Sequence, residues 1–186
     1  MSRIKVIAYE EATGRLKEIY DDIISKRGKL AGVHSIQSLR PESIVKHMDL
    51  YMEIMFSKSE LSRAEREMMA VVVSAANECK YCQVHHAIAL NNYWKDEEKV
   101  NILRQNYKKA VLTKREQELC EYSSITTINP GLSNDLDLTK PLRDIGLSDN
   151  GILDASLVVA YFNFVNRIVL SLGLNVEEDG GSGYKY

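Results

Sequence analysis

Residues 67–86 read EMMAVVVSAANECKYCQVHH, and most of what the sequence predicts depends on this stretch. Two residues separate Cys79 from Cys82, and His85 and His86 follow in the next turn. On an α-helix, Cys79, Cys82 and His86 would fall within about 60° of one another, because offsets of three and four residues share a face. Two thiols and an imidazole on one helical face are the parts of a redox or nucleophilic thiol site.

The segment before the cysteines is predicted to be a buried helix. Ser62 and Glu65 have the spacing of a capping box, and the chain from Met68 to Val73 is apolar on almost every side. Three consecutive valines favour a strand, but they lie inside a capped helical pattern without turn residues. We expect Asn77 to end this helix in a left-handed conformation, and a new buried helix to begin near Cys79 and end near Tyr93.

The rest of the chain also shows helical spacing of apolar residues. Helices are predicted over residues 10–27, 41–55, 96–107, from 112 onward, near Leu142, and over 148–172. Residues 28–40 and 126–139 carry loop signals, and no stretch alternates for long enough to form a strand. The sequence therefore predicts an all-α protein of about six to eight helices, with one domain over residues 1–176 and a disordered tail over 177–186.

The net charge, the apolar runs and the number of cysteines indicate which binding partners and which cellular location to expect for the protein. The net charge of −2 gives no reason to expect nucleic acid or an anionic membrane, and no apolar run was expected to reach the roughly 18 residues of a membrane span. The N-terminus lacks the apolar region of a signal peptide. Three cysteines are an odd number and too few for a disulfide scaffold. A reducing cytoplasm is therefore the expected location, where a CxxC pair favours catalysis or metal binding.

A weaker pattern suggests an internal duplication. Residues 112–123 repeat the form of residues 61–72, with a cap residue and two glutamates in matching positions, so that Glu118 corresponds to Glu67. No second CxxC follows Glu118. Cys120 lies in this second copy without a neighbouring histidine, and we expect it to be a buried bystander.

Four kinds of site are compatible with a pair of cysteines at this spacing. Haem attachment requires a histidine where Gln83 stands, and thioredoxin-like exchange usually accompanies a βαβ unit that this chain lacks. A zinc ion could not bind both Cys79 and His86, which would lie about 10 Å apart along a helix. A zinc site made of both cysteines and either His34 or His47 remains an alternative. The preferred interpretation is a redox-active dithiol at the start of a helix.

Glu67 joins this site if the chain reverses at Asn77. A hairpin of two helices would place Glu67 beside His86, one turn from Cys82, and produce a carboxylate–imidazole–thiol relay. The alternative is that Glu67 is a solvated charge on the helix surface.

The residues Glu67, Cys79, Cys82 and His86 together resemble the E-x11-C-x2-C-x3-H signature of the alkylhydroperoxidase D family, within the carboxymuconolactone decarboxylase superfamily. The YCxxHH form at residues 81–86 and the later YFNFVNRI are similar to its branch of uncharacterised peroxidase-related enzymes. The resemblance covers about residues 7–176.

The resemblance implies an all-helical, oligomeric enzyme that reduces alkyl hydroperoxides by thiol chemistry without metal, haem or another cofactor. It implies that Cys82 is the peroxidatic thiol, Cys79 the resolving thiol, and Glu67 with His86 the proton relay. A lipoylated protein or another dithiol would be the reductant. Tyr81 stands where better-known members carry a histidine, and His85 is a candidate to replace it.

Two functions remain open at this point: a hydroperoxide-reducing enzyme, and a dithiol module for redox sensing or thiol–disulfide exchange without efficient turnover. The final helix, residues 148–172, carries apolar residues on more than one face, whereas a helix on the surface of a monomer needs only one apolar face. This pattern predicts a homo-oligomer, which would be a dimer, trimer or hexamer.

Overall fold

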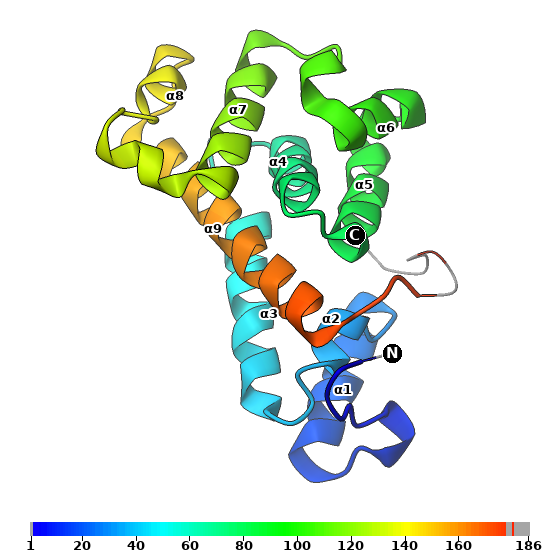
Figure 1. Ribbon diagram of the computed structural model, residues 1–186. Helices are drawn as coiled ribbons and strands as arrows, with labels where there is room; N and C mark the ends of the chain where they lie inside the picture. Colours follow the sequence, from blue (N-terminus) through cyan, green and yellow to red (C-terminus); the bar gives the residue numbers. More distant parts are fainter. Residues whose placement is uncertain (1, 178–179, 181–186) are drawn as a thin grey trace.

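The computed structural model describes residues 2–177 and 180, and within them the chain is entirely helical (Figure 1). The α-helices are α1 (Gly14–Arg27), α2 (Gly32–Ser35), α3 (Pro41–Phe56), α4 (Arg63–Ala76), α5 (Lys80–Trp94), α6 (Glu97–Asn106), α7 (Lys114–Ile128), α8 (Lys140–Asp144) and α9 (Asp149–Leu172). Short 3-10 helices cover Tyr9–Glu11, Tyr107–Lys109 and Pro130–Asn134. The predicted all-α class is confirmed.

The predicted helix list was wrong in two places. The described residues hold nine α-helices rather than six to eight, because the expected loop over residues 28–40 contains the four-residue helix α2. The first helix begins at Gly14 rather than at residue 10, since the extended Thr13 separates it from the 3-10 turn Tyr9–Glu11. Neither difference has a strong local signal, because both involve elements of only one turn.

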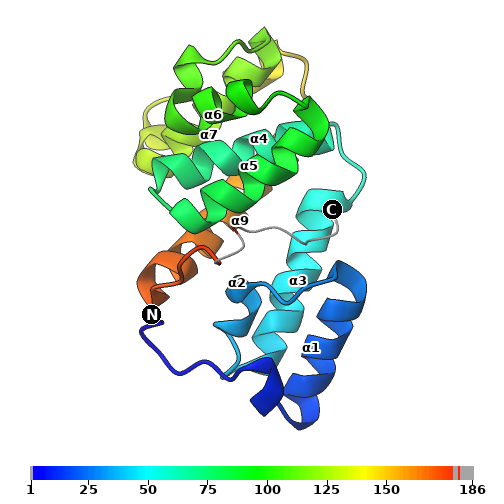
Figure 2. The ribbon, with the colours of Figure 1, turned by 90° about the vertical axis from the view of Figure 1, so that its right-hand side faces the viewer.

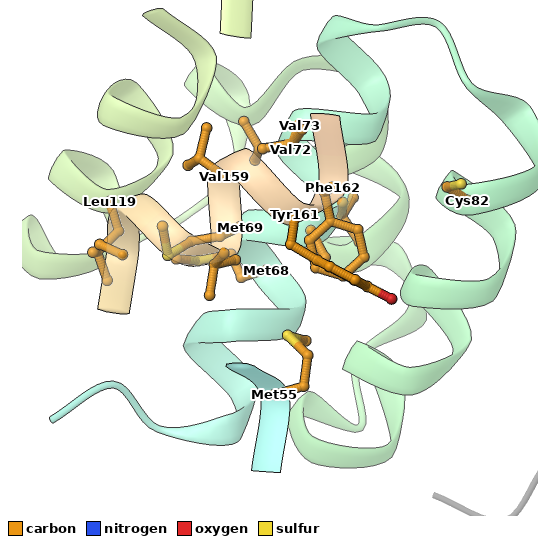
Figure 3. Close-up of a cluster of buried hydrophobic side chains, with 14 of the residues drawn as sticks. Met55, Met68, Met69, Val72, Val73, Cys82, Leu119, Val159, Tyr161 and Phe162 are labelled. Carbon is orange, nitrogen blue, oxygen red and sulfur yellow. The ribbon is translucent and has the colours of Figure 1, made fainter. Parts of the chain in front are cut away.

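Helix α4 is the centre of the fold. The predicted capping box is present: the Ser62 hydroxyl accepts from the Glu65 amide at 3.2 Å, and the Glu65 carboxylate accepts from the Ser62 amide at 2.7 Å. Met68 and Met69 are fully buried, as the pattern predicted, because α5, α7 and α9 all pack on α4. Figure 3 shows these methionines meeting Leu119 of α7 and Val159 of α9.

The reversal between α4 and α5 occurs one residue later than expected. Glu78, with φ 56°, adopts the left-handed conformation that was predicted for Asn77, whose φ is −87°. The Asn77 side chain instead donates to the side-chain oxygens of Asn163 and Asn166 on α9, each at 3.0 Å. Asn77 therefore fixes the turn against α9 while Glu78 changes the chain direction.

Helix α5 was expected to be buried, and only one side of it is. Tyr81, Cys82, Ala87, Ala89 and Leu90 are buried, mainly against α4, while the opposite side is partly accessible to solvent. The predicted helix start is confirmed, because Cys79 is the residue that precedes the first helical residue, Lys80.

The first three helices form a smaller unit below the α4–α9 layer (Figure 2). Leu16, Ile19 and Tyr20 of α1 pack with Ile44 of α3 in a hydrophobic cluster of their own. Met48 of α3 contacts this cluster and the main core, so α3 connects the two.

The expectation that no segment is long and apolar enough to span a membrane is wrong for helix α9. It contains an 18-residue stretch that is long and apolar enough to cross a membrane by length and composition. In this fold it is a core helix, because α3, α4 and α7 pack on it and its Val158 and Phe162 are fully buried. Its polar Asn166 is also fully buried and binds Ser74 and Asn77.

We predict that a second copy of the chain covers the outer face of α9. Leu153, Leu157 and Phe164 are 57%, 38% and 46% exposed, and they lie within about 40° of one another on the helix. Leu157→Lys should therefore dissociate an oligomer that light scattering detects for the wild type at micromolar concentration. Val111→Lys is the matched control, because Val111 is an isolated apolar residue at 86% exposure. A monomeric, soluble wild type would contradict the prediction.

Candidate active site

The hairpin of α4 and α5 brings Glu67 to His86. The Glu67 Oε2 and His86 Nδ1 atoms lie 2.6 Å apart, so the contact expected from the spacing of the two residues around the turn is present. The alternative of a solvated Glu67 is wrong, because the side chain is fully buried.

Arg63 supplies the second partner of the buried carboxylate. Its Nη2 donates to Glu67 Oε1 at 2.5 Å, and its Nη1 donates to the Met55 carbonyl at 2.6 Å. Because N–H groups reach the carboxylate from two sides, Glu67 is an acceptor on both oxygens, and His86 must carry its proton on Nδ1. The ring nitrogen left for chemistry is therefore Nε2. Arg63 is not among the predicted site residues, although its position four residues before Glu67 is a recognisable ion-pair spacing.

The two cysteines are reduced and buried at the start of α5. The Cys82 thiol and the Cys82 backbone N–H both hydrogen-bond to the Cys79 sulfur, and they lower the Cys79 pKa although burial opposes them. The same thiol bond, followed by burial, raises the Cys82 pKa well above its usual value. Negative charge is therefore favoured on Cys79 over Cys82.

Cys82 and His86 both line a small pocket of about 80 Å³. Aromatic and imidazole side chains make up most of its wall, among them Tyr51, Tyr161, Phe162, His34 and His47. Cys79 does not line this pocket and is fully buried. A wider groove of about 610 Å³ between α1 and α3 contains none of the predicted site residues, so size alone does not identify the reactive centre.

His85 does not reach Glu67 but binds another carboxylate. Its Nε2 lies 2.8 Å from Glu177 Oε2, and the Tyr81 hydroxyl donates to Glu177 Oε1 at 2.9 Å. Burial raises the Glu177 pKa, but the hydrogen bonds, led by that of His85, lower it overall to about 2. Glu177 was assigned to a disordered tail, and at this residue the assignment is wrong, because Glu177 also accepts from the Gly32 amide at 3.2 Å. The rest of that prediction concerns residues 178–186, which apart from Gly180 lie outside the described residues.

The two histidines named for a zinc site make other contacts. His47 Nδ1 lies 2.8 Å from Gln37 Nε2, and His47 Nε2 lies 2.7 Å from the Tyr161 hydroxyl. Burial lowers the pKa of His34 to about 3 and that of His47 to about 4. Among the described residues, no group of three or more His, Cys, Asp or Glu side chains could hold a metal ion.

Cys120 lies in α7 and is fully buried. Burial, followed by the charges of Glu116 and Glu121, raises its pKa. Cys120 is not among the residues that line the pocket of Cys82.

Comparison with known proteins gives a family match and several structural relatives. Residues 44–107, which include the whole Glu67–His86 segment, match the Carboxymuconolactone decarboxylase family. No curated protein matches the sequence of the chain.

Three solved structures are similar in fold over nearly the whole chain. An uncharacterised peroxidase-related protein from Silicibacter sp. TM1040 is 25% identical, with a TM-score of 0.82 and full coverage of both chains. The "alkylhydroperoxidase AhpD core: uncharacterized peroxidase-related protein" from Ralstonia eutropha JMP134 is 24% identical, with a TM-score of 0.85 and coverage of 97% of this chain and 94% of that one. The debrominase Bmp8 is 15% identical, with a TM-score of 0.78 and coverage of 96% and 94%, and at that identity it shows the fold alone.

These findings confirm the resemblance seen in the sequence. The chain has the alkylhydroperoxidase AhpD-like fold of the peroxidase-related proteins. Its central region, residues 44–107, matches the Carboxymuconolactone decarboxylase family.

Proposed function

We propose that this protein reduces alkyl hydroperoxides through the Cys79–Cys82 dithiol, with Glu67 and His86 as its proton relay. The observation that carries the proposal is the 2.6 Å bond between Glu67 and His86, made beside a pocket that His86 and Cys82 line together. The peroxidase-related relatives of the same fold support it. The cysteine pair argues against the decarboxylase chemistry of other superfamily members.

We propose that the cycle starts when the cysteine pair has lost one of its two protons. When the remaining proton moves from Cys82 to Cys79, the thiolate on Cys82 faces the pocket and can attack the terminal oxygen of a hydroperoxide. A sulfur–oxygen bond forms and the oxygen–oxygen bond breaks, so that Cys82 becomes a sulfenic acid and an alkoxide leaves. The imidazolium of His86, held by the Glu67 carboxylate, gives its proton to the alkoxide, and the product is an alcohol.

Cys79 completes the cycle by attacking the Cys82 sulfenic acid. A disulfide forms, the Cys79 proton passes to His86, and the hydroxide that leaves Cys82 takes it up as water. Two electrons and two protons from a dithiol, such as a lipoylated protein partner, restore the thiols. This requirement for a reductant agrees with the proposed location in the cytoplasm.

A second candidate is a dithiol sensor or exchange module, and the raised Cys82 pKa favours it. A thiol that holds its proton tightly reacts slowly with peroxide, because the thiolate is the nucleophile. Such a module would be oxidised once and would turn over poorly.

Steady-state turnover separates the two candidates. We predict that the wild type consumes many equivalents of tert-butyl hydroperoxide with dihydrolipoamide as reductant, and that Cys82→Ser abolishes this consumption. Cys120→Ala is the control and should keep the rate within a factor of about two, because Cys120 is a buried thiol outside the pocket. One equivalent consumed per protein, without further turnover, would support the sensor.

The roles of the two cysteines can be separated by trapping. In Cys79→Ser, one equivalent of hydroperoxide should leave a sulfenic acid on Cys82 that persists and reacts with dimedone, because the resolving thiol is gone. Peptide mass spectrometry locates the adduct. Since the structure favours the thiolate on Cys79, the opposite experiment is needed. A dimedone adduct on Cys79 in Cys82→Ser, formed as fast as the one on Cys82, would reverse the assignment.

The relay is tested by removing its charge. Glu67→Gln keeps the shape of the side chain, and we predict a loss of about 10–100-fold in the rate of peroxide reduction, part of the usual contribution of acid–base catalysis. Glu118→Gln is the matched control, since Glu118 also pairs with a basic residue four positions earlier, Lys114, but lies outside the pocket. Combining Glu67→Gln with His86→Ala should cost little more than the worse single change. Fully multiplicative losses would show that the two residues act independently.

A further inference from the structure

The hydrogen bonds of Gln37 determine where the proton of His47 lies. Gln37 Nε2 donates to the Val33 carbonyl oxygen at 2.8 Å and also lies 2.8 Å from His47 Nδ1. A carbonyl oxygen can only accept, so the atom facing it must be the amide nitrogen and the side chain cannot be flipped. The second hydrogen of this nitrogen points at His47 Nδ1, which must therefore accept.

His47 in turn determines the direction of the Tyr161 hydroxyl. Because Nδ1 accepts and burial keeps the ring neutral, with a pKa of about 4, the ring proton is on Nε2. This Nε2–H donates to the Tyr161 hydroxyl oxygen at 2.7 Å. The hydrogen of Tyr161 itself takes no part in that bond, and within residues 2–177 the hydroxyl makes no hydrogen bond other than the one with His47.

The unused hydroxyl hydrogen belongs to a residue of the reactive pocket. Tyr161 is 5% exposed and lines the same pocket as Cys82 and His86. In Figure 3 its hydroxyl points away from Met68 and Met69, toward the side of the cluster where Cys82 lies. Burial, followed by the nearby Tyr51 and Cys82, raises the Tyr161 pKa well above its usual value, so the phenol keeps its proton.

We propose that Tyr161 is a catalytic residue whose hydroxyl donates a hydrogen bond to the oxygen that leaves when Cys82 attacks a hydroperoxide. Gln37 and His47 are positioning residues, because they hold the acceptor side of this hydroxyl and leave only its donor side for the pocket. The inference rests on the proposed peroxidase function.

The attack of Cys82 on the hydroperoxide requires no proton from Tyr161. The sulfur–oxygen bond forms as the oxygen–oxygen bond breaks, and the departing alkoxide carries the electron pair. Tyr161 stabilises this charge through its hydrogen bond and keeps its own proton, while the imidazolium of His86 supplies the proton that completes the alcohol. A fixed donor aimed at developing negative charge is worth most in a buried site such as this one.

Tyr51 is the competing donor. It lines the same pocket, and its hydroxyl accepts from Arg63 Nη2 at 3.3 Å, which also leaves a hydrogen unassigned. The bond is longer than that of Tyr161, so the Tyr51 hydroxyl is held less firmly. The experiment must therefore include both tyrosines.

The test compares two oxidants that differ in their leaving group. Tyr161→Phe should slow the single-turnover reduction of tert-butyl hydroperoxide about 10–100-fold, somewhat less than the usual effect of removing an oxyanion donor. Peracetic acid releases a carboxylate, which needs little stabilisation, and its reduction should slow by less than about threefold. Alkylation of Cys82 by iodoacetamide should keep its wild-type rate, because no leaving oxygen is involved.

Three further variants keep the test decisive. Tyr122→Phe, which removes a hydroxyl bound to Ser156 outside the pocket, should change neither reaction. His47→Leu removes the group that orients Tyr161 and should show the same preference for peracetic acid to a smaller extent, even if Tyr161→Phe folds poorly. Tyr51→Phe should show no such preference.

Equal slowing of both oxidants in Tyr161→Phe would assign the residue a structural role and overturn the proposal. A leaving-group effect in Tyr51→Phe alone would assign the donor to Tyr51. A wild type that reduces neither oxidant would refute the peroxidase function itself, whereas a reactive wild type with an unaffected Tyr161→Phe would refute this inference alone.

Discussion

The structure depends on one buried carboxylate. Glu67 is fully buried on α4, and its charge is balanced by Arg63 on the same helix and His86 on α5. Removing one partner of a buried ion pair typically costs about 3–5 kcal/mol, because a charge is then left uncompensated. Arg63 also binds the Met55 carbonyl of α3, so the same cluster joins α3, α4 and α5. The groups that hold the reactive hairpin together are therefore the groups that orient His86.

In this site, the cysteine with the lowered pKa is not the cysteine that lines the pocket. The Cys82 backbone N–H and thiol favour the thiolate on Cys79, which is fully buried and outside the pocket. Cys82 lines the pocket, and its hydrogen bond to Cys79, followed by burial, raises its pKa. In the proposed peroxidase cycle, an incoming hydroperoxide meets a thiol that becomes reactive only when its proton moves to Cys79. The raised pKa limits unproductive alkylation or oxidation of the Cys82 sulfur, since the thiolate is the reactive form.

Local patterns predicted the elements on which the site is built. The capping box of Ser62 and Glu65, the start of α5 at Cys79, and the hairpin contact of Glu67 with His86 all follow from spacing within 25 residues. The left-handed residue was misassigned to Asn77, because its side chain binds α9, which no local pattern reveals. Glu177 and Tyr161 were missed as parts of the site for the same reason. Each reaches it from a distant part of the chain, 92 positions from His85 for Glu177 and 114 from His47 for Tyr161.

The most direct test of the central interaction is the protonation of the two nitrogens of the His86 ring. In ¹⁵N-labelled protein at neutral pH, long-range ¹H–¹⁵N correlation spectra report which ring nitrogen carries a proton. We predict a protonated Nδ1, with its proton shifted downfield by the short bond to the Glu67 carboxylate and shifted back in Glu67→Gln. A ring with an unprotonated Nδ1, or a spectrum unchanged by Glu67→Gln, would show that Glu67 does not hold His86.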